Sequence, residues 1–495
     1  MSKERKSGIL LPVASLPAKY GIGTMGKEAY HFIDCLKEAG QSFWQILPLG
    51  ATGYGDSPYQ SFSTFAGNPY YIDLEMLVEE GLLTEEELDA FDFGDNEEYI
   101  DYEKIYRCRF KALRLAYERC NLEYNGAFWE FVGENKFWLE DYALFMAIKN
   151  SYDGKSFAEW DDDIRLRKEE ALQRCKNLYA DEINFYRFQQ FYFMKQWKKL
   201  KEYANQNGIG IIGDIPIYVA FDSADTWSEP KLFQIDEEGL PVSVAGCPPD
   251  AFSDLGQLWG NPLYDWKYHK ETGYDWWIRR MFHCRKLYDV VRVDHFRGFD
   301  SYYAIPYGNE DAKVGEWEEG PGMDLFNTMK DRLGEMQVIA EDLGFLTESV
   351  LQLVKDSTFP GMKVLQFAFD HNNPNDYLPH NYPHNCVVYT GTHDNDTLLG
   401  WLKELSAEDR AFAKEYMHVL TDNDEDIAEA VIRLAMSSVA KICIVPIQEF
   451  LKKDGSARIN KPATLGDNWK WRMRREELTG EVVEKIRRMT WLYGR

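Results

Sequence analysis

Eight short apolar runs, spread along the whole chain, constrain the fold of this sequence more than any other feature. Most contain four to six residues and are rich in Val and Ile, as expected for strands that are buried on both faces. The runs are Gly8–Leu11, Ser42–Leu47, Gly208–Ile217, Asp289–Asp294, Gln337–Glu341, Lys363–Phe367, Cys386–Tyr389 and Lys441–Pro446.

Helical patterns lie between most of these runs, for example at Tyr30–Ala39, Trp276–Leu287, Met323–Leu333 and Glu348–Lys355. Eight alternating strand and helix units predict an α/β protein that folds as a (β/α)8 TIM barrel. A doubly wound open sheet is the alternative, and the number of strands alone does not decide between the two.

Two stretches differ from ordinary barrel connections. Residues 76–206 are acidic and helical, and Thr84 and Glu87 form a capping-box pattern there, which predicts an inserted, mainly helical subdomain. Residues 221–264 are rich in Pro and Gly with little periodicity, which predicts a long loop region at the active site. Because no linker divides the chain, we expect residues 1–495 to form a single catalytic barrel domain with these insertions.

The charge and the cysteines limit the partners and the compartment. The 495 residues include 56 Lys and Arg against 82 Asp and Glu, a net charge of −26, so we expect neither nucleic acid nor membrane as a partner. Eight Cys without a C-x-x-C pair indicate free thiols in a reducing compartment and predict a cytoplasmic location. No window approaches the about 18 apolar residues of a membrane span.

Acidic side chains stand at the ends of several predicted strands. Asp214, Asp294 and Glu341 end the third, fourth and fifth runs, and His393-Asp394 follows the seventh. Parallel barrel strands open onto one face, so these groups are expected to converge there. A single carboxylate after a strand is more often a helix cap or a surface charge than a catalyst, but several together, each just past an apolar run, favour a site.

Clustered carboxylates suit either a metal site or glycosyl transfer. The nine His contain no H-x-H or H-E-x-x-H pattern, although a Mg²⁺ or Ca²⁺ site built only from oxygen atoms stays open. Glycosyl transfer requires one carboxylate nucleophile and one carboxylic acid beside the leaving oxygen. Arg292 lies two residues before Asp294 on the same strand face, where it is expected to lower the pKa of Asp294.

Six motifs resemble those of the amylomaltases, the 4-α-glucanotransferases or disproportionating enzymes of glycoside hydrolase family 77. The resemblance covers nearly the whole chain, and the tyrosine-rich N-terminal motif separates this family from the α-amylases. The motifs are Gly53-Tyr-Gly-Asp-Ser-Pro-Tyr-Gln-Ser-Phe62 with Ala66-Gly-Asn-Pro69, Gly213-Asp-Ile-Pro-Ile-Tyr-Val219, Trp259-Gly-Asn-Pro262, Arg292-Val-Asp-His-Phe-Arg-Gly298, Ala340-Glu-Asp-Leu-Gly344 and Gly391-Thr-His-Asp-Asn-Asp396.

The resemblance implies α-1,4-glucans as substrates (maltooligosaccharides, amylose and glycogen-derived chains), with no cofactor and no metal. It implies that Asp294 is the nucleophile, Glu341 the general acid/base and Asp394 a third carboxylate that distorts the sugar. The implied substrate-binding residues are Tyr54, Tyr59, Asp214, Asp250, Trp259, Arg292, His295 and His393. An α-amylase-type hydrolase, a non-catalytic glucan-binding protein and a metal-dependent barrel hydrolase are the alternatives, and the choice of a transferase over a hydrolase rests on the resemblance.

Two local features refine these expectations. Tyr59 follows the turn-forming residues Gly53–Pro58, so we expect it to lie on an exposed loop and act as a sugar platform, whereas for Tyr54 packing and binding are equally favoured. Ala463 stands where the family tends to have Gly, and Ala adopts positive φ less readily. This difference bears on the shape of that loop and not on the chemistry.

Overall fold

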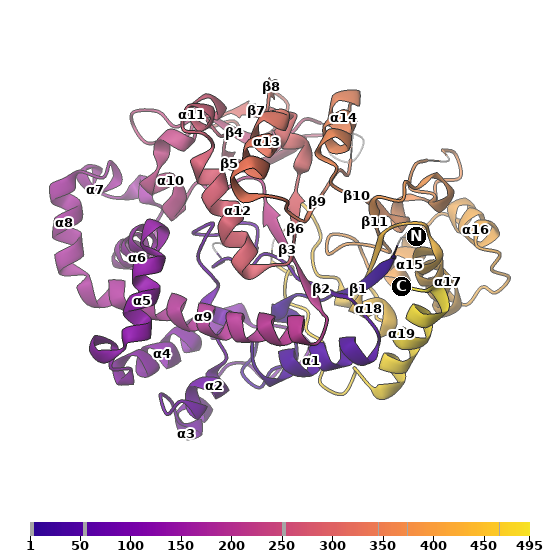
Figure 1. Ribbon diagram of the computed structural model, residues 1–495, viewed down its shortest axis with the longest axis horizontal. Coiled ribbons are helices and arrows are strands. Elements are labelled where there is room, and N and C mark those ends of the chain that lie inside the picture. Colours follow the sequence, from indigo (N-terminus) through magenta and orange to yellow (C-terminus); the bar gives the residue numbers. More distant parts are fainter. Residues whose placement is uncertain (1–3, 53–56, 250–253, 345, 374, 465) are drawn as a thin grey trace.

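The chain folds around a barrel of eight parallel strands (Figure 1), seen in a computed structural model that describes residues 4–495 except 53–56, 250–253, 345, 374 and 465. The strands follow one another around the barrel in chain order, which confirms the predicted TIM barrel over the open sheet. They are β1 (Lys6–Leu10), β2 (Phe43–Gln45), β3 (Gly210–Pro216), β6 (Val290–Asp294), β9 (Val338–Ala340), β10 (Gly361–Val364), β11 (Cys386–Tyr389) and β12 (Ile442–Pro446).

The barrel closes through two different seams. Strand β1 pairs in parallel with both β2 and β12, so the first and last strands are neighbours. Strands β9 and β10 have no regular ladder, but the backbone N–H of Ala340 donates to the carbonyl of Pro360 at 3.0 Å. The chain ends also meet, because the Arg495 side chain donates to the Lys6 carbonyl at 3.1 Å.

Helices cover the outside of the barrel in most of the connections (Figure 1). The connection from β10 to β11 instead contains two short 3-10 turns, Leu365–Phe367 and Pro379–Asn381. The helices outside the long insertion are α1 (Lys27–Glu38), α10 (Ala224–Ser228), α11 (Trp266–Glu271), α12 (Asp275–Leu287), α13 (Gly322–Leu333), α14 (Glu348–Ser357), α15 (Leu398–Glu404), α16 (Ala407–Tyr416), α17 (Asp424–Ser437), α18 (Ile447–Phe450) and α19 (Gly480–Tyr493).

The stretch 76–206 contains helices that gather on one side of the barrel, at the left of Figure 1. Thr84 and Glu87 form the capping box at the start of α3. The long helix α9 packs against α1 and α12, which joins this group to the barrel wall. The helices from this part of the chain are α2 (Leu74–Glu79), α3 (Glu85–Asp89), α4 (Tyr102–Arg119), α5 (Gly126–Glu134), α6 (Lys136–Ser151), α7 (Asp162–Arg165), α8 (Glu169–Leu178) and α9 (Ala180–Gln206).

The stretch 221–264, predicted to be a long loop, contains regular structure as well. Strands β4 (Ser243–Cys247) and β5 (Gln257–Pro262) pair antiparallel there, with a shift in register between Val244 and Gly246. The sheet is completed by β7 (Ser301–Pro306) and β8 (Glu316–Glu319), which come after β6 in the chain. The loop prediction is therefore wrong for these two strands. Strand β4 also pairs with β7, more than 50 residues further along the chain, and a contact of this kind leaves no local pattern.

The barrel interior is apolar at one end and polar at the other. Ten buried side chains form a separate interior cluster: Leu10, Ile212, Val290, Ile339, Met362, Val364, Val387, Tyr389, Ile442 and Ile444.

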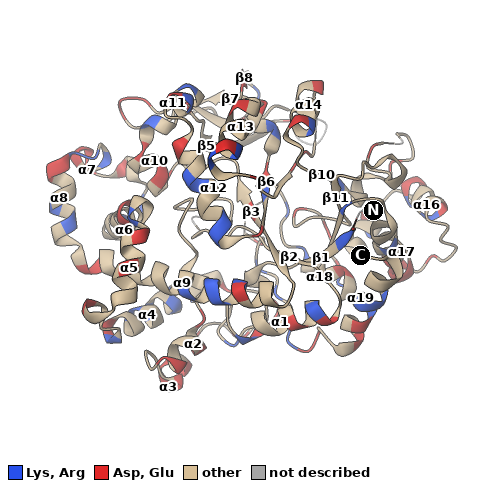
Figure 2. Cartoon of the chain, viewed as in Figure 1, with Lys and Arg blue, Asp and Glu red and all other residues tan. Residues whose placement is uncertain are grey.

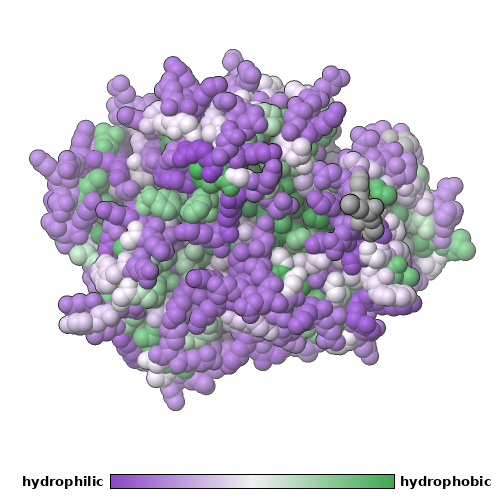
Figure 3. Space-filling view, viewed as in Figure 1, coloured by the Kyte–Doolittle hydropathy of each residue, from purple (hydrophilic) through white to green (hydrophobic). Residues whose placement is uncertain are grey.

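On the surface, Lys, Arg, Asp and Glu mix along outer helices such as α9 and α19 (Figure 2). Hydrophilic residues cover most of the face in Figure 3, with hydrophobic ones gathered near its centre. Among the described helices, none combines the length and the apolar character needed to cross a membrane.

Candidate active site

A buried arginine joins two of the predicted site carboxylates. Arg292, within β6, has only 3% of its side chain exposed, and its Nη1 donates to both carboxylate oxygens of Asp214 at 2.7 Å each. The same Nη1 lies 3.1 Å from Oδ1 of Asp294, the last residue of β6. Asp214 is fully buried in the neighbouring strand β3, so the predicted Arg292–Asp294 contact exists within a larger network.

The electrostatic consequence for Asp294 differs from the sequence-based expectation. Burial raises the pKa of Asp294 to about 6, and Arg292 acts in the opposite direction without reversing the rise. Arg292 lowers the pKa as expected, but the larger effect of burial, together with the negative charge of Asp214, makes the net change a rise. Asp294 is still mainly ionised at neutral pH, and 32% of its side chain is exposed, so a substrate can reach it.

Glu341 follows β9 and is held by the backbone on both sides of its carboxyl group. The N–H of His295 donates to Oε2 at 2.7 Å, and the N–H of Leu343 donates to Oε1 at 2.8 Å. His295 adopts a left-handed conformation, with φ of 52°, and this turn directs its N–H toward Glu341. Burial, together with the negative charge of Asp294, raises the pKa of Glu341 to about 7. Glu341 can therefore hold and release a proton near neutral pH.

Asp394 lies in the loop after β11 and belongs to a second chain of contacts. The Tyr59 hydroxyl donates to Asp214 at 2.9 Å and lies 2.9 Å from Nε2 of His393. The same His393 nitrogen is 3.3 Å from Oδ1 of Asp394, whose side chain is 42% exposed. These contacts bring the carboxylates from β3, β6, β9 and β11 to the same end of the barrel.

Tyr59 is less exposed than the sequence predicts. It is half-buried, stacks on the His393 ring at 5.3 Å with an interplanar angle of 19°, and directs its hydroxyl into the network. Burial raises the pKa of Tyr59 well above its ordinary value, so the hydroxyl stays protonated and acts as a donor. This geometry indicates that Tyr59 orients Asp214 and His393 in addition to any contact with a ligand.

Trp259 and His295 form an aromatic corner beside the carboxylates. Trp259 is half-buried on β5, and its ring meets the His295 ring edge to face at 4.8 Å. Burial lowers the pKa of His295 to about 3, so its imidazole is neutral. Two other predicted ligand-binding residues, Tyr54 and Asp250, lie outside the residues that the structure describes.

Sequence reasoning missed two residues that contact Asp394. Nδ2 of Asn460 donates to Asp394 Oδ1 at 2.6 Å, and Nη2 of Arg458 donates to the Asp394 carbonyl at 2.7 Å. The Asn460 N–H also donates to the His393 carbonyl at 3.0 Å. Both residues lie just before Ala463, and nothing in the sequence indicates that this segment lies against the loop after β11.

Ala463, which stands where the family tends to have Gly, lies in the loop that follows Asn460. Ala463 adopts φ of +62°, the left-handed region in which Gly is favoured. The chain therefore takes a glycine-type conformation at this position although the residue is Ala. The substitution changes the strain at this position and leaves Asn460 in contact with Asp394.

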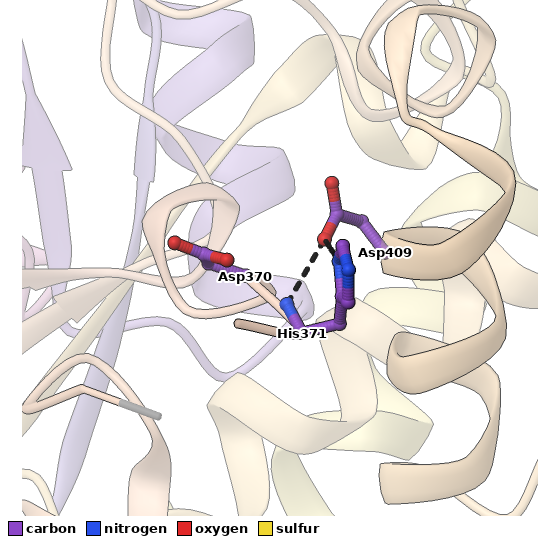
Figure 4. A group of neighbouring side chains, drawn as sticks. All are labelled: Asp370, His371 and Asp409. Atoms are coloured by element: carbon purple, nitrogen blue, oxygen red, sulfur yellow. Dashed lines mark hydrogen bonds and ion pairs between the residues drawn. The ribbon is translucent and has the colours of Figure 1, made fainter. Parts of the chain in front are cut away.

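One group among the described residues has the composition of a metal site: Asp370, His371 and Asp409 (Figure 4). Asp409 Oδ1 accepts from the N–H of His371 at 2.9 Å and lies 2.7 Å from its Nδ1. Asp409 raises the pKa of His371 through this hydrogen bond, as expected for an ion pair. The contacts explain the cluster as a link between the loop after β10 and helix α16.

Fold and site together define a class of protein. The parallel barrel places an ionised Asp, a protonatable Glu and a third Asp at the C-terminal ends of its strands. This arrangement is typical of enzymes that act on glycosidic bonds. Chemistry of this kind uses one carboxylate as nucleophile and one carboxylic acid beside the leaving oxygen.

Comparison with known proteins identifies the family. The family model described as 4-α-glucanotransferase, of glycoside hydrolase family 77, matches residues 11–479. The 4-α-glucanotransferase of Clostridium butyricum is 51% identical to this chain, and the match covers 98% of this chain and 99% of that protein. The 4-α-glucanotransferase of Thermus thermophilus is 45% identical, and the match covers 99% of both proteins. Amylomaltase from Streptococcus agalactiae, solved in complex with acarbose, is 43% identical with a TM-score of 0.96, covering 99% of this chain and all of its own.

The chain therefore belongs to the 4-α-glucanotransferases of glycoside hydrolase family 77, and its activity is that of a 4-α-glucanotransferase. This result confirms the resemblance expected from the motifs. The amylomaltase of Corynebacterium glutamicum, at 19% identity and a TM-score of 0.76 over 99% of this chain and 74% of its own, shares the fold.

Proposed function

We propose that the enzyme transfers a segment of an α-1,4-glucan to the 4-hydroxyl of another glucan or of glucose by retaining double displacement. The supporting observation is the pair of carboxyl groups at β6 and β9. Asp294 is mainly ionised at neutral pH, and Glu341 beside it has a pKa raised to about 7. Because burial and the negative charge of Asp294 both raise the pKa of Glu341, and Arg292 contacts Asp294, the pair suits the roles of acid and nucleophile respectively.

In the first step, Asp294 attacks the anomeric carbon while Glu341 gives its proton to the leaving glycosidic oxygen. The bond to the departing glucan breaks, and a covalent glycosyl-aspartate forms. In the second step, Glu341 removes the proton from the 4-hydroxyl of the acceptor, which displaces Asp294 and creates a new α-1,4 bond. A retaining enzyme requires carboxyl groups about 5–5.5 Å apart, and we expect this separation once a glucan is bound.

The other site residues are proposed to hold and distort the glucan. Asp394 and His393 grip the sugar at the cleavage point, since Asp394 is partly exposed and fixed from behind by Asn460. The neutral His295 donates to a sugar hydroxyl, and Trp259 offers its ring to a sugar face. Arg292 and Asp214 orient the nucleophile. For Tyr54 and Asp250 the proposal rests on the motifs alone.

The substrates and the compartment belong to the same proposal. We infer that maltooligosaccharides, amylose and glycogen-derived chains serve as donors, and that this chain binds acarbose as the streptococcal relative does. We also place the enzyme in the cytoplasm. All eight Cys are free thiols, which fits a reducing compartment.

The test is incubation with maltotriose and separation of the products by chromatography. Transfer yields glucose together with chains longer than maltotriose, and the number of reducing ends stays constant. Products limited to glucose and maltose, with a steady rise in reducing ends, would show that water replaces the sugar acceptor and that the enzyme is a hydrolase.

A further inference from the structure

The guanidinium of Arg292 has one contact that the catalytic scheme does not explain. Its Nη1 serves Asp214 and Asp294, whereas its Nε–H points to the sulfur of Met362, with a nitrogen–sulfur distance of 3.4 Å. Both residues are buried, with exposed fractions of 3% for Arg292 and 1% for Met362. A buried N–H that lacks a partner is destabilising, so this acceptor matters for the orientation of the guanidinium.

Met362 is itself fixed by the residue next to the proposed acid. Its backbone N–H donates to Oδ1 of Asp342 at 2.6 Å, across the seam between β9 and β10 where no regular ladder exists. Gly361 permits this approach, because a Cβ at that position would lie 2.3 Å from Oδ2 of Asp342. The contacts thus run from the Glu341-Asp342 pair through Met362 to Arg292 and on to Asp294.

The chemistry of a thioether suits this position. Sulfur accepts a hydrogen bond weakly and carries no charge. A carboxylate in its place would compete with Asp294 for the positive charge of Arg292, and an aliphatic side chain would leave the buried N–H without an acceptor. A neutral acceptor holds the guanidinium in place and leaves its charge to the carboxylates.

We propose that Met362 is a positioning residue for the transfer reaction, which holds Arg292 in the orientation in which its Nη1 contacts Asp294. The inference rests on the proposed role of Asp294 as the nucleophile. Several charged or titratable groups face Arg292 and Asp294 and stay unchanged when Met362 is replaced: Asp214 from β3, Glu341 after β9, Tyr389 from β11, His393 and Asp394 after β11, and Tyr59 from the early loop.

The pH dependence of glycosylation tests the proposal. With an α-glucosyl fluoride the C1–F bond breaks and fluoride leaves with little need for protonation, so the acid limb of kcat/KM reports the ionisation of the nucleophile. Met362→Leu removes the hydrogen-bond acceptor and keeps a similar side-chain volume. The acid limb of kcat/KM should then shift by about half a pH unit to higher pH, which lowers kcat/KM about threefold at pH values below the limb. Met362→Gln supplies an amide oxygen and should restore the limb toward that of the wild type.

Ile442→Leu is the matched control, since Ile442 lies in the same interior cluster on β12 and makes no polar side-chain contact. The proposal is overturned if folded Met362→Leu keeps the wild-type acid limb, or if the Leu, Gln and control variants shift alike. If Met362→Leu does not fold, a second comparison replaces Met by norleucine throughout the chain, at all 14 positions of the wild type. The norleucine-containing wild type should show the shift of the acid limb, and the norleucine-containing Met362→Gln variant should not. An active Asp294→Asn would instead refute the proposed nucleophile, so the two failures are distinguishable.

Discussion

Removal of the Glu341 carboxyl should change how the stability of the protein depends on pH. The pKa of Glu341 rises from its ordinary 4.5 to about 7 on folding, mainly because the group is buried. Below pH 4.5 the group is protonated in both the folded and the unfolded chain. Above pH 7 it is ionised in both, and only the folded protein then bears the cost of a buried charge. Stability is therefore lost as the pH rises through this window.

The magnitude follows from the two pKa values. Their difference corresponds to about 3 kcal/mol, at about 1.36 kcal/mol for each pH unit. Glu341→Gln cannot ionise, so its free energy of unfolding relative to the wild type should rise by about 3 kcal/mol between pH 4.5 and pH 7. For 495 residues, with an unfolding entropy of about 2.1 cal/mol/K per residue, this amounts to about 3 °C in Tm.

Thermal unfolding of both proteins at several pH values measures the effect. The amide can accept only one of the two backbone N–H bonds from His295 and Leu343, which adds a constant offset but no pH dependence. Glu237→Gln, on an exposed loop residue, serves as the control and should run parallel to the wild type. A difference between Glu341→Gln and the wild type that stays flat, or falls as the pH rises, would refute the reasoning.

Two further substitutions test other parts of the site. Asn460→Ala removes the 2.6 Å hydrogen bond to Asp394, and a charge-assisted bond of about 1.5–3 kcal/mol implies a loss of at least tenfold in kcat for maltotriose; an unchanged kcat would show that Asn460 does not hold Asp394. Ala463→Gly relieves the left-handed conformation and should raise the free energy of unfolding in urea by about 1 kcal/mol, whereas a decrease would contradict the assigned strain.

The barrel could be predicted because its strands are buried on both faces and read as continuous apolar runs. The strand from Lys363 to Phe367 was placed two residues too late, since β10 begins at Gly361 and Leu365–Phe367 form a 3-10 turn. The antiparallel strands β4 and β5 could not be predicted, because β5 pairs with β4, and β4 in turn pairs with β7 across more than 50 residues. Local propensity carries little information about such contacts.

The carboxylates proposed to be catalytic could be located because each ends or follows an apolar run. Their environment could not be predicted, as Asp294 shows. The sequence placed Arg292 on the same strand face, and Arg292 does lower the pKa of Asp294. The burial of Asp294, and the position of Asp214 at 2.7 Å from the same Arg292 nitrogen, could not be predicted, and they make the net change a rise. Asn460 was missed for a related reason, since its contact with Asp394 joins positions 66 residues apart.

The covalent intermediate is the central claim, and trapping it is the most direct measurement. Glu341→Gln lacks the acid and base, yet an α-glucosyl fluoride needs little acid assistance, so glycosylation should proceed while transfer to an acceptor is blocked. The glycosyl-enzyme should then accumulate, and mass spectrometry of the digested protein should locate a single glucosyl group on Asp294. An adduct on Asp394 would reverse the assigned roles, and the absence of any adduct while fluoride is released would contradict the double-displacement mechanism.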